Sequence, residues 1–277
     1  MKRHLHLLTL AITTLALCAA TGSAAEPEAA ATATPETPAA EAQQPADAPL
    51  PVIDPERPLR LQLSIYAWLS SLTNDVTTRN SESTTDIAFS DLLSAVDFAN
   101  FAHLEVQKGK WGAFSELDFI KLSQDAEFRN PRGIPFKIGA DLVLKQTMIE
   151  LGAIRSFEGK RVGLDALLGA RYFRIDSDVN VGPFESSISK DWVDPMIGAR
   201  LRFKLSDRWN ASLRGDFAGF GVGSELTTNA VAVISYTISD RYDVGFGYRY
   251  MDLKYEKERL DLDMTTYGPV VGMNIRF

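Results

Sequence analysis

The chain has 277 residues and a mass of 30.5 kDa, with 45% hydrophobic residues, 23% charged residues and a mean hydropathy of −0.08. This hydropathy, and the lack of a long apolar run after the first 20 residues, exclude a membrane protein built from helices. The net charge of −7 gives no general affinity for nucleic-acid phosphates, and the single cysteine, Cys18, excludes an intramolecular disulfide and a cysteine-rich metal site.

The first 25 residues have the pattern of a secretory signal peptide. Two basic residues precede a mostly apolar stretch over 5–20, and small residues at 23–25 match what a signal peptidase recognises. We therefore expect cleavage before Glu26. The alternative is a lipoprotein anchored through Cys18, although Leu17 stands where a lipobox needs a small residue.

Residues 26–58 are predicted to form a disordered periplasmic linker. They hold eight of the chain's 13 prolines and no aromatic residue, so they cannot build a hydrophobic core. The segment carries one base, Arg57, against seven acids, which gives it a net charge of −6. The acids are Glu26, Glu28, Glu36, Glu41, Asp47, Asp54 and Glu56. We interpret the segment as a spacer in front of the folded part of the chain.

From Leu59 onward the hydrophobic pattern has a period of two, which predicts β-strands. The pattern is clearest from Tyr267 to Phe277, where apolar residues alternate with small or polar ones such as Asn274 and Arg276. A last strand of this kind that stops on phenylalanine resembles the C-terminal strand of bacterial outer-membrane β-barrels, where it is the assembly signal. The resemblance implies that the barrel-assembly machinery recognises the strand ending at Phe277.

The upstream segments alternate in the same way, and their two faces differ in character. One face is continuously apolar, whereas the other mixes glycines with charges of both signs. This difference favours a lipid-facing exterior and a hydrated interior over a soluble sandwich. The sequence therefore predicts an all-β fold over 59–277, a transmembrane antiparallel up-and-down β-barrel. Ten strands are predicted, at 60–71, 98–108, 111–122, 138–157, 161–176, 191–205, 209–218, 225–238, 242–252 and 264–277.

Short and long connections alternate between these strands. The short turns lie near 109–110, 159–160, 206–208 and 239–241, and the polar connections between them are longer, as in outer-membrane barrels. We therefore expect a bacterial outer-membrane location with the linker and the C-terminus in the periplasm. The least regular segment, 72–97, is interpreted as one long outer loop. A hairpin hidden there would raise the count to twelve strands, and a misread first pair would lower it to eight.

Aromatic side chains are predicted to form two girdles at the membrane interfaces. Four lie beside the short turns or at the C-terminus: Trp111, Trp209, Tyr242 and Phe277. Four lie toward the opposite strand ends: Trp68, Tyr172, Trp192 and Tyr250. Outer-membrane lipid is therefore an expected partner, and nucleic acid is not.

The polar faces bring charged side chains into the predicted lumen. Counting outward from the first short turn places His103 opposite Glu116, and counting from the second places Glu150 diagonal to Arg171. The predicted lumen charge network consists of His103, Glu105, Glu116, Asp118, Glu150, Asp165, Arg171, Asp194, Arg200, Arg202, Arg214, Asp216, Arg249 and Arg276.

A histidine beside a carboxylate is a candidate catalytic base. However, His103 stands close to a short turn, and the chain has no GxSxG motif, no metal-ligand spacing and no second histidine after residue 25. We interpret the pair of His103 and Glu116 as structural. We therefore predict no catalytic, metal or cofactor site, and we expect a protein that is not an enzyme.

Several short motifs are spread over most of 60–277. They are Asp97-Phe98-Ala99, Lys108-Gly109-Lys110-Trp111-Gly112, Trp192-Val193-Asp194-Pro195, Arg214-Gly215-Asp216, Phe220-Gly221-Val222-Gly223-Ser224 and Gly247-Tyr248-Arg249-Tyr250. Together they resemble a family of uncharacterised proteobacterial outer-membrane β-barrel proteins. The resemblance implies fold and location, and it carries over no activity and no functional residue.

Three functional hypotheses follow from these observations. The first is a non-enzymatic outer-membrane barrel that forms a narrow channel for small polar solutes, with lumen charges that set its ion preference. The second is a structural or surface-interaction barrel with a closed lumen, which acts through its extracellular loops. The third is a membrane-embedded hydrolase.

Overall fold

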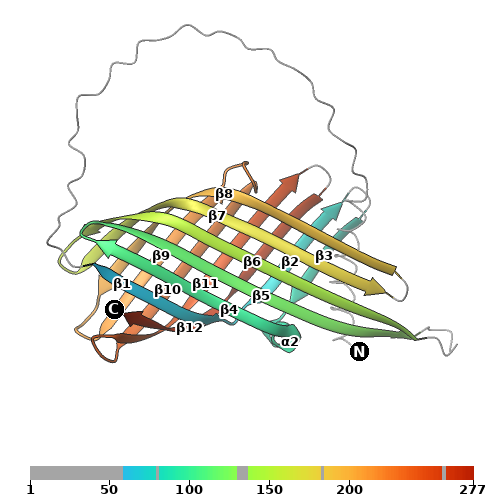
Figure 1. The fold of residues 1–277 in the computed structure, drawn as a ribbon, viewed down its shortest axis with the longest axis horizontal. Coiled ribbons are helices and arrows are strands. Elements are labelled where there is room, and N and C mark those ends of the chain that lie inside the picture. Colours follow the sequence, from blue (N-terminus) through green and yellow to red (C-terminus); the bar gives the residue numbers. More distant parts are fainter. Residues whose placement is uncertain (1–58, 79–80, 130–136, 182–183, 258–259) are drawn as a thin grey trace, which may run out of the picture.

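The computed structural model describes residues 59–78, 81–129, 137–181, 184–257 and 260–277, and the predicted signal peptide and linker lie outside them. The described residues form one antiparallel sheet and one short helix (Figure 1). The elements are β1 (Arg60–Trp68), β2 (Ser71–Thr78), β3 (Ser81–Ile87), α2 (Phe89–Ala95), β4 (Val96–Lys108), β5 (Trp111–Arg129), β6 (Lys137–Glu158), β7 (Val162–Val181), β8 (Phe184–Lys204), β9 (Trp209–Gly219), β10 (Leu226–Thr237), β11 (Tyr242–Lys257) and β12 (Leu260–Arg276). Among these residues, no helix is long and apolar enough to cross a membrane.

Ten of the strands close into a barrel. Each strand from β4 to β12 pairs with the next along the chain, and β1 closes the ring between β4 and β12. Gln62 of β1, for example, is paired with Glu105 on one side and with Arg276 on the other. This confirms the predicted ten-stranded antiparallel barrel. We call the end that carries the short turns and Phe277 the turn end, and the opposite end the loop end.

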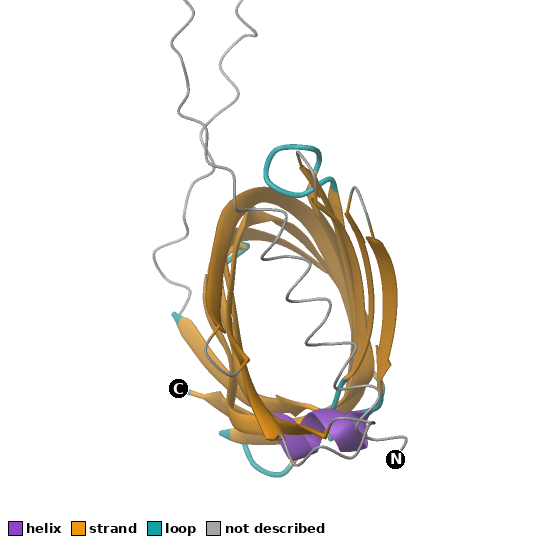
Figure 2. Cartoon of the chain, turned by 90° about the vertical axis from the view of Figure 1, so that its right-hand side faces the viewer, coloured by secondary structure: helices purple, strands orange, loops and turns teal. Residues whose placement is uncertain are grey.

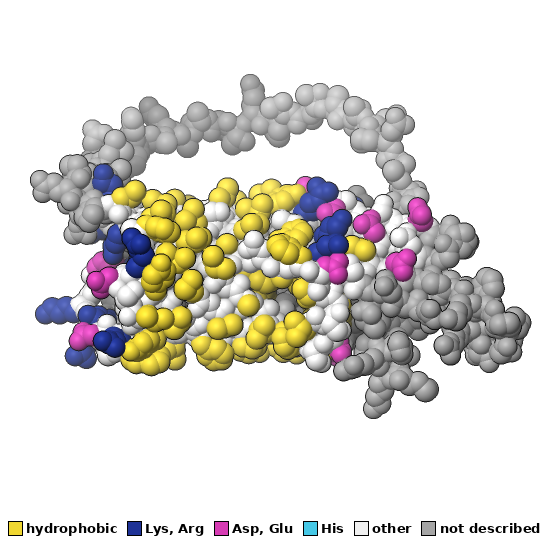
Figure 3. All heavy atoms as spheres, turned by 60° about the horizontal axis from the view of Figure 1, so that its bottom comes forward, with side chains coloured by type: hydrophobic (Ala, Val, Ile, Leu, Met, Phe, Trp, Pro, Cys, Tyr) yellow, Lys and Arg dark blue, Asp and Glu magenta, His cyan; other side chains and the backbone are white. Residues whose placement is uncertain are grey.

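Side chains alternate between the two sides of the barrel wall. Leu168 and Phe246 point outward and are each 66% exposed, whereas Arg171 and Arg249 point inward and are 0% and 1% exposed. Exposed apolar side chains occur on all ten barrel strands, and on the face shown in Figure 3 they form a band with charged side chains at both of its ends. An apolar exterior of this extent is costly in water, so the band is suited to contact with an apolar phase.

The segment 72–97 is not the single loop that the sequence predicts. It contains the hairpin of β2 and β3 followed by α2. The hairpin does not add strands to the closed ring. Strand β2 pairs with β12 beyond the point where the pairing of β1 with β12 stops, and β3 pairs only with β2 among the described strands. The predicted loop is therefore wrong, and the hairpin does not raise the strand count as the sequence alternative supposed.

Several strands extend further toward the loop end than their apolar pattern indicates. The strand predicted at 111–122 continues to Arg129 in the structure. The strand predicted to start at residue 191 begins at Phe184. Backbone pairing continues in these extensions, from Ser123↔Val143 to Arg129↔Lys137. The periodic signal depends on one side of the wall being apolar, so it ends before the hydrogen-bonded ladder does.

The wall is interrupted near the loop end, between β3 and β5. The pairing of β4 with β5 stops at Val96↔Leu122, and beyond this point the described part of β5 pairs only with β6. Helix α2 lies at this interruption (Figure 2). Leu92 of the helix packs with Ile87 and Leu122 in a small buried cluster, so apolar contacts replace the missing strand pairing.

Candidate functional site

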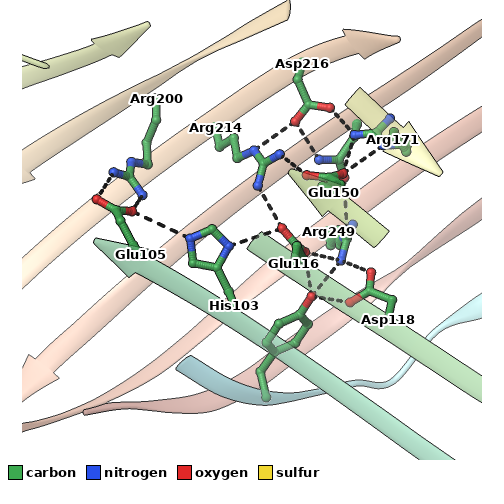
Figure 4. A network of polar contacts seen from close by, with 12 residues as sticks. His103, Glu105, Glu116, Asp118, Glu150, Arg171, Arg200, Arg214, Asp216 and Arg249 are labelled. Atoms are coloured by element: carbon green, nitrogen blue, oxygen red, sulfur yellow. Dashed lines mark hydrogen bonds and ion pairs between the residues drawn. The ribbon is translucent and has the colours of Figure 1, made fainter. Parts of the chain in front are cut away.

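Charged side chains from opposite walls meet in the middle of the lumen (Figure 4). Arg249 of β11 donates through Nη1 to Asp118 of β5 at 2.8 Å and to Glu116 of β5 at 3.1 Å. The hydroxyl of Tyr66 on β1 lies 2.7 Å from both carboxylates. A guanidinium and two carboxylates this close and this buried form strong charge-assisted hydrogen bonds, which tie the two walls together.

Two further arginines, Arg171 and Arg214, complete the centre of the network. Arg214 of β9 donates to Glu116 at 2.8 Å, to Glu150 at 2.5 Å and to Asp216 at 2.9 Å. Arg171 of β7 donates to Glu150 at 2.8 Å and also to Asp216. Glu116, Glu150 and Asp216 thus each accept from two arginines, and Asp118 accepts from Arg249 and Tyr66, which compensates for taking these charges out of water.

A limb of the network runs from this centre toward the turn end. The ring of His103 lies between two carboxylates, with Nδ1 3.4 Å from Glu116 and Nε2 3.6 Å from Glu105. Arg200 donates to Glu105 at 2.7 Å and to Asp165 at 2.8 Å. Arg202 extends the limb from Asp165 to Glu158 near the turn end.

The structure brings all fourteen residues of the predicted lumen network into polar contacts. Twelve belong to one connected set: His103, Glu105, Glu116, Asp118, Glu150, Asp165, Arg171, Arg200, Arg202, Arg214, Asp216 and Arg249. Two lie apart from it. Asp194 accepts hydrogen bonds from Trp192 and Ser224, and Arg276 pairs with Asp243.

One register differs from the sequence prediction. Glu150 was expected to lie opposite Gly169 and diagonal to Arg171, but it lies directly opposite Arg171. The difference arises because the turn is longer than 159–160, and its closing hydrogen bond runs from Gly159 N to Val162 O at 3.0 Å. The other predicted pair, His103 opposite Glu116, is confirmed.

Uncharged members of the network were not predicted as site residues. Asn229 accepts from Arg249 Nε at 3.0 Å and donates to Asp216 at 2.8 Å. Ser156 accepts from Gln107 and donates to Asp165 at 2.6 Å. Their positions on the inward side of β10, β6 and β4 were the available signal, since every second residue of a barrel strand faces the lumen.

The lumen has an apolar layer on the loop side of the network. Its buried members come from β6, β7, β8, β11 and β12: Met148, Phe173, Trp192, Met251, Leu253 and Met264. Trp192 of β8 and Tyr255 of β11 approach each other across this layer, with ring centroids 4.7 Å apart. On the turn side the lumen is open, with a cavity of about 200 Å³ beneath Arg214 and Arg249 and a basin of about 500 Å³ at the mouth.

No protein-family model and no curated protein matches the chain. Several solved structures match the chain. The outer membrane protease OmpT of Escherichia coli has a TM-score of 0.55 and 8% identity over 80% of this chain and 98% of that chain. The transport unit of the autotransporter AIDA-I of Escherichia coli has a TM-score of 0.40 and 10% identity, over 80% and 91%. The attachment invasion locus protein Ail of Yersinia pestis has a TM-score of 0.34 and 14% identity, over 79% and 99%.

The fold is that of an outer-membrane β-barrel. In this barrel the apolar side chains lie on the outside and the enclosed charges lie on the lumen side, as the alternation requires. At these identities the likeness concerns the fold alone. Among the described residues, no group of three or more His, Cys, Asp or Glu side chains is placed to hold a metal ion.

Six of the eight predicted girdle residues lie on the outside of this outer-membrane barrel. Those at the turn end are exposed, namely Trp111, Trp209, Tyr242 and Phe277, and Tyr172 and Tyr250 face outward nearer the loop end.

The predicted positions of Trp68 and Trp192 in the outer girdle are wrong, because both side chains point into the barrel. The Arg249 guanidinium lies over the Trp68 ring, 4.6 Å from its centroid, and Trp192 stacks on Phe173 at 5.4 Å. Trp68 stands two residues from the inward Tyr66, and Trp192 stands two residues from the inward Asp194, so both lie on the lumen side of their strands. Their position near a strand end predicts a membrane interface, but the side of the strand decides which way a side chain faces.

Asp194 anchors the turn between β9 and β10 to this outer-membrane barrel's wall. It accepts from the backbone N and the Oγ of Ser224, each at 2.7 Å, and from Trp192 Nε1 at 3.1 Å. The turn contains a non-glycine residue with positive φ, Phe220 at 52°, between two glycines of positive φ. A conformation of this kind persists when surrounding contacts hold it, and Asp194 supplies them.

Replacing Asp194 with alanine is expected to lower the free energy of unfolding by about 2–4 kcal/mol, because buried donors of Ser224 and Trp192 lose a charged acceptor. Urea unfolding followed by tryptophan fluorescence measures the loss. Asp191→Ala is the matched control, since Asp191 lies on the exposed side of the same strand. Equal unfolding midpoints for the two variants would show that the turn does not depend on Asp194.

Proposed function

We propose that the chain is a non-enzymatic bacterial outer-membrane barrel with a closed lumen, which meets other molecules at its two ends and not through a pore. The contact between Arg249 and Asp118 supports this most directly. It joins β11 to β5 across the ring, and both residues are less than a tenth exposed. Side chains that meet across the ring in this way occupy the space through which a solute would pass.

The apolar layer supports the same proposal independently. Its side chains come from both sides of the ring, and Phe173 and Leu253 are 0% exposed. An ion that crossed this layer would lose its hydration without gaining polar partners. The two layers together leave the lumen accessible from the turn end only as far as the cavity beneath Arg214.

Planar-bilayer recording tests the closed lumen. The refolded wild-type chain is expected to insert without producing conductance steps at any voltage that the bilayer tolerates. Heat-modifiable migration on a gel shows in parallel that the protein is folded. Regular conductance steps from the wild-type chain would favour the alternative function, a narrow channel for small polar solutes, because the charged layer would then be its selectivity region.

The proposed orientation places the turn end in the periplasm, and it places the loop end, with the long β5–β6 and β7–β8 hairpins, outside the cell. It rests on the short turns, on the C-terminal strand ending at Phe277, which we expect the barrel-assembly machinery to recognise, and on the lipid-facing band. The sequence motifs suggest that the relatives of this chain are uncharacterised proteobacterial outer-membrane barrels.

The contacts of His103 support the absence of hydrolase activity. Both ring nitrogens face carboxylates, and the ring stacks on Phe114 with centroids 5.8 Å apart. A catalytic histidine in a hydrolase needs a nucleophile or a water within hydrogen-bond reach of one nitrogen. The two carboxylates suit a structural cation better than a general base.

A further inference from the structure

In the basin at the turn end, basic side chains outnumber acidic ones. Seven Lys or Arg side chains and three Asp or Glu side chains line its volume of about 500 Å³. Four of the seven have carboxylates within ion-pair distance, as Arg202 has Glu158 and Arg276 has Asp243. Arg60, Lys160 and Arg161 have no such partner among the described residues, so the basin carries a local excess of positive charge.

These three cations come from two places that the fold brings together. Arg60 begins β1, and Lys160 and Arg161 form the exposed turn between β6 and β7. The turn-end location of the basic side chains is visible at one end of the apolar band (Figure 3). Converging cations at the mouth of a low-dielectric cavity attract a flexible anionic segment more strongly than scattered surface charges do.

An anionic segment of the same chain precedes Arg60 in the sequence, and Arg60 lines this basin. Residues 26–58 carry a net charge of −6 and are joined directly to Leu59, next to Arg60. Asp54 and Glu56 stand six and four residues before Arg60, so each lies within about 20 Å of it at roughly 3.5 Å per residue. A tether this short gives the acids an effective concentration on the order of millimolar at the basin.

We propose that the basin binds the acidic segment 26–58 of its own chain through Arg60, Lys160 and Arg161. This goes beyond the closed lumen, since it holds whether or not the barrel conducts. The segment then acts as an intramolecular anionic ligand of the turn end. Any separate acidic partner must displace it, which makes binding at this end sensitive to competition and to salt.

Zero-length carbodiimide cross-linking of the folded full chain in detergent tests the proposal. It joins carboxylates to amines only when the two are in contact, and mass spectrometry identifies the linked peptides. We expect links from the acids of 26–58 to Lys160 and Lys204, the two lysines that line the basin. Because about 1 M salt shortens the screening length to about 3 Å, their yield should fall several-fold there.

Two matched double variants separate the basin from general attraction at the rim. Lys160→Ser with Arg161→Ser is expected to reduce the links to Lys204 at least threefold. Lys108→Ser with Lys110→Ser, which changes another turn-end turn outside the basin, should leave them unchanged. Heat-modifiable migration confirms that both variants are folded.

Three results would overturn the proposal. The first is the absence of links to Lys160 and Lys204 at low salt, and the second is an equal loss of links in both double variants. The third is an unchanged yield of links to Lys204 in the Lys160→Ser, Arg161→Ser variant together with weaker binding to phosphatidylglycerol vesicles. That result would assign the basin's cations to anionic lipid headgroups.

Discussion

Replacing Arg171 with alanine is expected to lower the free energy of unfolding by about 3–5 kcal/mol, the range observed when one partner of a buried ion pair is removed. The side chain is 0% exposed and donates to Glu150 and Asp216, which are also 0% exposed. Without the guanidinium, two carboxylates remain in a low-dielectric layer with less compensation. Urea unfolding of the refolded barrel measures the difference.

Arg174→Ala is the matched control for this prediction. Arg174 lies three residues further along the same strand, but it faces outward, is exposed and pairs with the half-buried Asp176. Surface ion pairs contribute little, so this variant should unfold close to the wild type. Combining Arg171→Met with Glu150→Gln should recover part of the lost stability. A loss of similar size in the Arg174 and Arg171 variants would contradict a stabilising role for the lumen network.

Opening the lumen should require the removal of both layers at once. The double change Asp118→Ala and Arg249→Ala removes a matched pair from the charged layer, and Trp192→Ala removes the largest side chain of the apolar layer. Each change alone leaves the other layer in place. The triple variant is therefore expected to show conductance steps in planar bilayers, whereas the double and single variants should show none.

The controls for this experiment lie in the basin and on the barrel's outside. Arg202→Ala alters a partly exposed charge at the mouth, and Trp209→Ala alters an outward tryptophan of the girdle. Neither should produce steps when added to the wild type. Steps in the Trp192→Ala variant alone would show that the charged layer does not close the lumen, and silence of a folded triple variant would place the closure elsewhere.

The strand count could be predicted from the sequence because alternate residues of a barrel strand face different environments, an apolar outside and a polar lumen. Ile197 faces outward and Asp194 faces inward, and this contrast repeats along the strands that cross the apolar band. The hairpin of β2 and β3 shows little of this contrast, since most residues of Ser71–Thr78 and Ser81–Ile87 are polar and Leu72, Val76 and Ile87 are too few to mark an apolar face. Periodicity therefore misses strands in which polar residues hold most positions.

The membership of the lumen network could be predicted from residue parity, but its partners could not. Parity places Glu116 and Arg249 inside, and hairpin arithmetic pairs neighbours such as His103 and Glu116. The contact of Arg249 with Asp118 depends on how the closed ring brings β11 opposite β5, which no local pattern encodes. The alternation of residues along the strand also predicts that Trp68 and Trp192 face the lumen, whereas their position near the strand ends predicts an interface. The alternation is the criterion that the structure bears out.

The sequence separation within the network bears on how the barrel assembles. Arg249 meets Asp118 at a sequence separation of 131 residues and Glu116 at a separation of 133. Hairpins that form between neighbouring strands pair Glu150 with Arg171, but they cannot pair Arg249 with Asp118. We therefore expect Arg249 and Asp118 to stay hydrated until the ring closes, so that their dehydration coincides with the last pairing step, which makes insertion cooperative and penalises any partly closed intermediate.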